Sequence, residues 1–421
     1  MSNKIESEYE NVFYFCIWGK KYLDEFTKYT CNSLIENLRK INNKKNLIYI
    51  WTIEKDLKYL KRKKIIKELK NIIEIKFYNF DYIKEKYYAS NSKYRFLSIL
   101  QSLFISSFSF NCKYIWFLYP DFLFTKNSIK FIVNKLENNK KLFSVMLPVP
   151  QVNQESIEAL YKKKGFNYIS DNLADIIIKN LHKIVKIFDI RNVQLNTISV
   201  SCIHEKNYLL MNNFHLHPIV IKTDTKDYKY FDSVFPSLDE GYTNILKEKA
   251  IYIPKDSNQV TFTSLLKKDE YSFGRHNFSI DKTAWWCEAH VNEFQRKNLN
   301  HTFTFYGNKP RFNGLKFNSY LISKFKNRIL RRLNYSNRDL YDKGFYNQLA
   351  SRHVSQNNLG NDNKLLKMNR VYLDKIYKNQ FYKTFKKKVS TIIQEVHNEE
   401  RSEISKIIYN LYKDSFNLKI K

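Results

Sequence analysis

Short runs of apolar residues alternate with longer, more polar segments along the first 150 residues. The runs lie at 12–18, 46–53, 73–80, 114–120 and 142–149, and are rich in aromatic or β-branched residues. Such short runs predict strands that are buried on both faces. The segments at 21–40, 54–72, 92–107 and 126–138 predict helices. Strands that alternate with helices at this spacing predict an α/β fold with a doubly wound, mainly parallel sheet.

The remainder of the chain divides into a mixed segment and a basic tail. Residues 152–190 predict helix, and 208–222 have strand character on both sides of a His-Leu-His-Pro sequence. Residues 311–421 carry 24 Lys and Arg against 9 Asp and Glu. The resulting net charge of +15 is about half of the chain's net charge of +31. We therefore predict a domain over 1–310 and a basic, mainly helical region over 311–421. The tail helices either pack on the main body or lie on an anionic membrane surface.

The run at 114–120 places a carboxylate at a functionally important position. Pro120 cannot continue a central strand, so the chain leaves the sheet there and Asp121 lies just past the strand's carboxyl end. In an open α/β sheet this edge is where ligands bind. Asp121 is therefore either a ligand-binding carboxylate, for a divalent metal or a sugar hydroxyl, or a turn residue.

Composition limits the function classes. The chain has 421 residues, of which 43% are hydrophobic, so it can build a large core. The net charge of +31 favours polyanionic partners, although an AT-rich coding sequence would also produce a chain this rich in Lys, Asn, Ile, Tyr and Phe. Neither Gly-x-Gly-x-x-Gly nor a Walker sequence follows a predicted strand, which argues against Rossmann dehydrogenases and P-loop ATPases.

The cysteines and the amino terminus indicate a cytoplasmic protein. The five cysteines are scattered, with no Cys-x-x-Cys pair, which is typical of a reducing compartment. The first residues are polar and unlike a signal peptide, and no apolar run reaches the ~18 residues of a membrane span. We expect a cytoplasmic protein, whose tail either packs on the main body or contacts the inner face of the cell membrane.

Three further groups of residues could carry chemistry. His215 and His217 alternate along a predicted strand, so both imidazoles would face one side and could bind a divalent metal; the alternative is a structural role. Asp239 and Glu240 precede a glycine, and could serve as a general base or metal ligand, or be solvated turn residues. Lys93 and Arg95 open a predicted helix, where they could hold a nucleotide diphosphate.

Together these segments resemble the GT-A glycosyltransferases over roughly residues 12–260. The resemblance lies in a first strand that ends at Gly19, a second that ends in Thr52-Ile53-Glu54, and a Tyr-Arg-Phe-Leu helix before the strand that ends in Pro120-Asp121. It extends to a group of bacterial glycosyltransferase-like proteins with a His-x-His-Pro strand followed by a Thr-Ile-Asp-like element. These features correspond here to residues 215–218 and to Ser237-Leu238-Asp239.

The resemblance implies an activity and a site. It implies transfer of a sugar from a nucleotide-sugar donor to a cell-surface glycan or lipid-linked acceptor. The strand ends, with Trp18, Gly19, Thr52 and Glu54, would seat the nucleotide. Mn²⁺ or Mg²⁺ on the diphosphate would be held at Asp121. In GT-A enzymes this position belongs to a D-x-D motif. The corresponding residues here are Asp121-Phe122-Leu123, which have only the first carboxylate.

Other residues would complete this site. His215, His217 or Asp239 would complete the metal site, and Asp239 or Glu240 would act as base on the acceptor hydroxyl.

Three other hypotheses remain open. One is a nucleic-acid-binding protein without catalysis, suggested by the charge and the many aromatics, although no RNA- or DNA-binding signature is present. Another is a degenerate GT-A domain that binds without turnover. The third is a metal-dependent hydrolase that uses His204, His215, His217 and Asp239.

Overall fold

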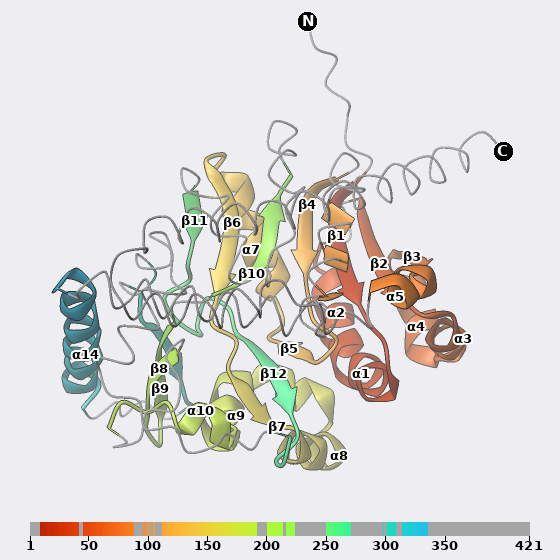
Figure 1. The fold of residues 1–421 in the computed structure, drawn as a ribbon. Coiled ribbons are helices and arrows are strands. Elements are labelled where there is room, and N and C mark those ends of the chain that lie inside the picture. The colour runs from red at the N-terminus through yellow and green to blue at the C-terminus, as the bar shows by residue number, and fades with distance from the viewer. Residues whose placement is uncertain are drawn as a thin grey trace, which may run out of the picture.

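The computed structural model contains a seven-stranded sheet at its centre (Figure 1). It describes residues 9–41, 45–87, 96–97, 100–101, 104–105, 112–191, 200–213, 216–223, 250–270, 298, 301–308 and 314–335. The strand order is β11-β6-β10-β4-β1-β2-β3. The strands are β1 Tyr9–Cys16, β2 Asn46–Thr52, β3 Glu74–Asn79, β4 Cys112–Phe117, β6 Leu142–Leu147, β10 His217–Lys222 and β11 Ala250–Tyr252.

The sheet is parallel except for one strand. Strands β3, β2, β1 and β4 pair in parallel, as do β11 and β6, whereas β10 runs antiparallel to both of its neighbours, β4 and β6. The predicted α/β fold with a mainly parallel sheet is confirmed. The reversal of β10 was not predicted, and it brings the start of that strand, His217, to the edge where the parallel strands end.

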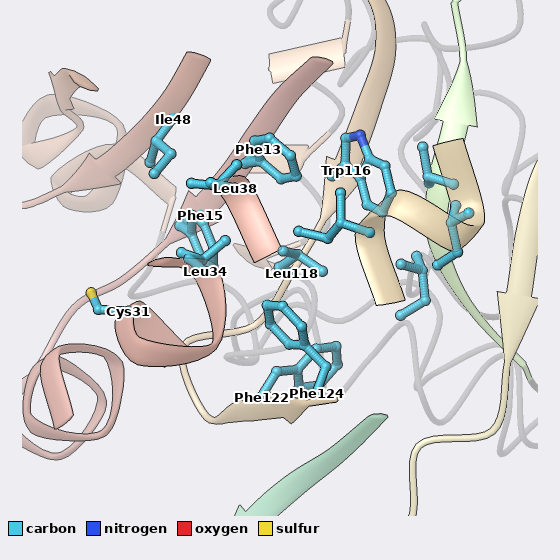
Figure 2. Packing of buried hydrophobic residues seen from close by; sticks show 14 of the residues in the cluster. Phe13, Phe15, Cys31, Leu34, Leu38, Ile48, Trp116, Leu118, Phe122 and Phe124 are labelled. Carbon is cyan, nitrogen blue, oxygen red and sulfur yellow. The ribbon is translucent and has the colours of Figure 1, made fainter. Parts of the chain in front are cut away.

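Both faces of this sheet are buried, and its apolar side chains belong to two hydrophobic clusters. The helices that follow its strands are α1 Lys20–Glu25, α2 Cys31–Leu38, α3 Glu54–Arg62, α4 Lys64–Lys70, α5 Asp81–Tyr87 and α7 Ser128–Asn138. On one face α2 and α7 pack on β1 and β4, and Figure 2 shows Leu34 and Leu38 beside Phe13 and Phe15. In α7 the buried residues recur at the spacing of one helix face: Ile129, Ile132, Val133 and Leu136.

Two predicted helices are interrupted. The helix predicted over 21–40 contains a π-helical turn, Phe26–Thr30, between α1 and α2. The helix predicted over 54–72 is divided at Lys63, whose backbone is extended. Turns of the π type are rare and occur frequently at functional sites.

A small sheet extends from the carboxyl ends of β4 and β6. It consists of β5 Phe122–Phe124, β12 Phe262–Leu266 and β7 Gln151–Asn153, in the order β5-β12-β7. In Figure 1 it lies below the large sheet, beside α1 and α8. Phe122 and Phe124 belong to the same apolar cluster as β1 and β4, so this small sheet shares the core of the large one.

A third sheet and four helices complete the described fold. The sheet contains β8 Val200–His204, β9 Tyr208–Asn213 and β13 Phe303–Tyr306. Its cluster includes residues of α8 Gln154–Asp171, α9 Leu173–Asn180 and α10 Lys183–Lys186, which occupy the predicted helical segment 152–190. Helix α14, Leu315–Tyr335, packs on β8 and β9 through Ile322. The rest of the predicted basic tail, from residue 336, lies outside the described residues.

Candidate functional site

The order of the strands marks one place on the sheet edge. From β1 the chain proceeds to β2 and β3 on one side, and then returns to β4 on the other side of β1. The chain therefore leaves the end of β1 toward β2, away from β4, and the order of the strands reverses between β1 and β4. In open α/β sheets ligands bind in the crevice outside the carboxyl ends of the strands, at such a switch point. The residues just past β1 and β4 are Trp18-Gly19 and Tyr119-Pro120-Asp121.

The end of β1 is an open bend. Gly19 has a φ of 90°, which glycine adopts readily, and no heavy atom lies within 4 Å of where a Cβ would stand. Its N–H donates to Asp56 Oδ2 at 2.7 Å, so α3 holds the bend in place. The Trp18 ring lies edge-on to Phe80 and Phe96, with centroids 5.8 Å from each. The bend thus leaves backbone accessible to a ligand while its aromatic neighbour is anchored.

The end of β2 holds two buried polar atoms. Among the described residues neither Trp51 Nε1 nor Thr52 Oγ1 has a hydrogen-bond partner. Glu54 begins α3, and its N–H donates to Asp81 Oδ2 at 2.9 Å, so the next strand's end caps the helix. The Glu54 side chain is exposed and lies 3.5 Å from Lys58 Nζ. Of the two predicted residues here, Thr52 is enclosed and Glu54 faces solvent.

The turn that carries Asp121 is held from two sides. The Thr30 hydroxyl lies 2.6 Å from the Pro120 carbonyl oxygen and 2.9 Å from that of Phe122, so one proton is shared between the carbonyls that flank Asp121. On the other side Leu265 N–H donates to the Asp121 carbonyl at 3.1 Å. Thr30 is the last residue of the π-helical turn. This turn therefore places its hydroxyl on the backbone around Asp121, whose side chain is half-buried.

Sequence reasoning missed Glu25, which lies in the same place. It is the last residue of α1, directly before the π-helical turn, and only 1% of it is exposed. Neither carboxylate oxygen has a hydrogen-bond partner among the described residues. The nearest cation, Lys21 Nζ, lies 3.9 Å from Oε1, which is too long for a hydrogen bond.

Glu25 is surrounded by charged groups from three segments. Lys21 comes from α1, Asp121 from the β4–β5 turn, and Lys267 and Glu270 from the segment after β12. Burial and, after it, the negative charge of Asp121 raise the pKa of Glu25 from 4.5 to about 8. Lys21 itself forms an ion pair with Glu270. A carboxyl group with this pKa is largely protonated at neutral pH.

His217 supports the end of β4. It is buried, and its Nε2 donates to the carbonyl oxygen of Phe117, the last residue of β4, at 2.9 Å. Its ring lies 4.7 Å from Tyr119 and 5.4 Å from Phe122, measured between centroids. His217 thus lies beside the Asp121 turn, as the predicted pairing of these residues requires, with one ring nitrogen engaged by backbone.

The described residues do not fit a metal ion. Within them no group of three or more His, Cys, Asp or Glu side chains is placed to hold one. Asp121 and His217 are the only two described members of the predicted metal set. Five other predicted residues lie outside the described part of the chain: Lys93, Arg95, His215, Asp239 and Glu240.

His204, a member of the alternative hydrolase set, belongs to the third sheet. Its Nε2 donates to the Ile178 carbonyl at 2.7 Å, and its N–H donates to Asp189. Burial lowers the pKa of this histidine. These contacts join β8 to α9, which is a structural role.

Comparisons with known proteins leave the chain without a family. No protein-family model and no curated protein matches it. Mouse xyloside xylosyltransferase 1, in its apo form, aligns at 12% identity over 37% of the chain, with a TM-score of 0.25. Two structures of S. aureus TarS align at 10% identity over 82% and 87% of the chain, with TM-scores of 0.30 and 0.31.

The matched lengths differ among these structures. The chain spans 58% of the xylosyltransferase structure, and 79% and 54% of the two TarS structures. All three TM-scores lie below 0.5. They therefore establish no activity for the chain, and its own geometry has to support any assignment.

Proposed function

We propose that the chain is a glycosyltransferase that moves a sugar from a nucleotide-sugar donor to a cell-surface glycan or lipid-linked acceptor. One observation carries this proposal. The open bend at Gly19 and the turn that carries Asp121 follow the two strands that flank the switch point, and the backbone of each is fixed by hydrogen bonds to neighbouring elements. This edge of an α/β sheet is where nucleotides bind, and the sequence resemblance to GT-A enzymes points to the same residues.

The donor would lie across the strand ends. Trp18, Gly19, Thr52 and Glu54 would seat the nucleoside. The enclosed hydroxyl of Thr52, at the end of β2, has no hydrogen-bond partner among the described residues. The diphosphate would be held by Lys93 and Arg95. The sugar would then extend toward Asp121, on the other side of β1.

The reaction needs two further contributions. The acceptor hydroxyl forms a bond to the anomeric carbon while the bond from that carbon to the diphosphate breaks, and the hydroxyl proton passes to a base. Asp239 or Glu240 remains our proposal for the base. Positive charge at the diphosphate stabilises the leaving group. Mn²⁺ or Mg²⁺ would supply it if His215 or Asp239 joined Asp121 and His217, because the described residues alone do not form a metal site.

Helix α14 supports the proposed proximity to lipid-linked acceptors. Its 21 residues include six Lys or Arg and no Asp or Glu. Three large hydrophobic side chains are strongly exposed among the described residues, and two of them, Phe317 and Tyr320, lie on this helix. Aromatic side chains beside basic ones fit an anionic membrane surface. No helix among the described residues has the length and apolar character needed to cross a bilayer.

Thermal unfolding of the full chain in the presence of nucleotides tests the proposed function. The panel contains uridine, guanosine and cytidine diphosphates and their sugar esters, each with and without Mn²⁺. A ligand that binds only the folded protein raises the melting temperature by mass action. We expect one nucleotide class to raise it selectively. No response to any nucleotide, together with steeply salt-dependent binding of single-stranded RNA, would instead favour the nucleic-acid-binding alternative.

A further inference from the structure

Glu25 is a buried carboxyl group that has no hydrogen-bond partner among the described residues. A buried carboxyl group without a hydrogen bond costs free energy, so such groups usually have a partner. Both oxygens of Glu25 lack one, and its side chain is 1% exposed. Lys21 Nζ, 3.9 Å from Glu25 Oε1, also forms an ion pair with Glu270, and these two side chains are 26% and 29% exposed. A ligand that displaced this ion pair would come close to the Glu25 carboxyl group.

The surroundings decide which chemical group fits. A phosphate would be repelled, because the negative charges of Asp121 and Glu270 already act on Glu25. A divalent cation would need at least one more ligand than this region offers, since the described residues hold no suitable group of three. A hydroxyl is neutral, and it can both donate and accept a hydrogen bond. It therefore fits a carboxyl group in either protonation state.

We propose that Glu25 belongs to the ligand site and hydrogen-bonds a hydroxyl of the donor sugar beside Asp121. This inference rests on the proposed function, in which the sugar extends toward Asp121, and it adds a residue that would bind this sugar. The π-helical turn links the two carboxyl groups. Glu25 directly precedes the turn and Thr30, at its end, holds the backbone around Asp121.

The test separates the sugar from the nucleotide. The dissociation constants of a nucleoside diphosphate and of its sugar ester are measured by calorimetry for the wild-type chain, and their ratio gives the contribution of the sugar. Glu25→Met keeps the size of the side chain and removes its hydrogen bonds. We expect it to raise the dissociation constant of the sugar ester by roughly 3- to 10-fold, the effect of one hydrogen bond, and to leave that of the diphosphate unchanged. In Glu25→Gln, whose amide also forms hydrogen bonds with hydroxyls, the ratio of the two dissociation constants should stay close to that of the wild-type chain.

A matched control and three contrary outcomes complete the experiment. Glu36→Gln alters a half-buried glutamate in α2 that already accepts a hydrogen bond from Ser170, and should change neither constant. If both dissociation constants are unchanged in Glu25→Met, the role of Glu25 is overturned while the proposed function stands. Equal weakening of both ligands would show a structural role only. If the wild-type chain binds no nucleotide at all, the proposed function fails, and this inference with it.

Discussion

Replacement of Glu25 by Gln should change how the stability of the protein depends on pH. The pKa of Glu25 is raised from 4.5 to about 8, first by burial and then by the charge of Asp121. Between these two values the unfolded chain has lost the proton that the folded protein still holds. The contribution of the Glu25 proton to the free energy of unfolding is therefore fully present below pH 4.5, and it is lost as the pH rises to about 8. In Glu25→Gln this loss is absent.

The magnitude follows from the size of the pKa change. Each unit corresponds to about 1.36 kcal/mol, so a rise from 4.5 to about 8 corresponds to at most about 5 kcal/mol across this pH range. The measurement is urea unfolding of the wild-type chain and the variant at pH 5, 6.5 and 8, followed by tryptophan fluorescence. Other titrating groups are common to both proteins and cancel in the difference.

The comparison has a clear contrary result. We expect the stability of Glu25→Gln relative to wild type to increase steadily from pH 5 to pH 8. Asp121→Asn should reduce this dependence, because it removes one of the charges that raise the pKa of Glu25. Parallel stability curves for wild type and Glu25→Gln at all three pH values would refute the buried, protonated state of this side chain.

Two further predictions concern the turn at Asp121 and helix α14. Thr30→Val removes the hydroxyl between the Pro120 and Phe122 carbonyls and should cost about 1–3 kcal/mol in urea unfolding. Thr27→Val, whose hydroxyl bonds only within its own helix, is the control, and an equal loss in both would contradict a special role for Thr30. Exchange of Phe317 and Tyr320 for Ser should reduce co-flotation with vesicles that contain anionic phospholipid; unchanged flotation would remove α14 from the proposed membrane contact.

The sequence determined the large sheet and the position of Asp121. Apolar runs such as 114–120 are short and β-rich, and a strand buried on both faces is the structure that buries all their side chains. Pro120 predicts that the chain leaves the sheet by this point, because it lacks the N–H that a central strand requires, and β4 ends three residues earlier, at Phe117. Structure and sequence therefore agree that Asp121 lies just past the carboxyl end of β4.

Tertiary structure alone decided the direction of β10 and the short strands. A strand buried on both faces, such as His217–Lys222, has the same run of apolar residues whether it pairs parallel or antiparallel, so the pattern cannot reveal the reversal. Strands such as β5 and β7 have three residues each, too few to show a period. Their pairing partner is β12, more than 100 residues away along the chain.

The character of Glu25 was also decided by tertiary structure. In the sequence it is one glutamate in a polar helical segment, where a solvated side chain is the normal outcome. Its burial arises because the Asp121 turn and the segment after β12, both distant in sequence, lie against the end of α1. Local sequence specifies that a helix forms there. Which of its side chains loses contact with water depends on chain segments that only the folded protein brings together.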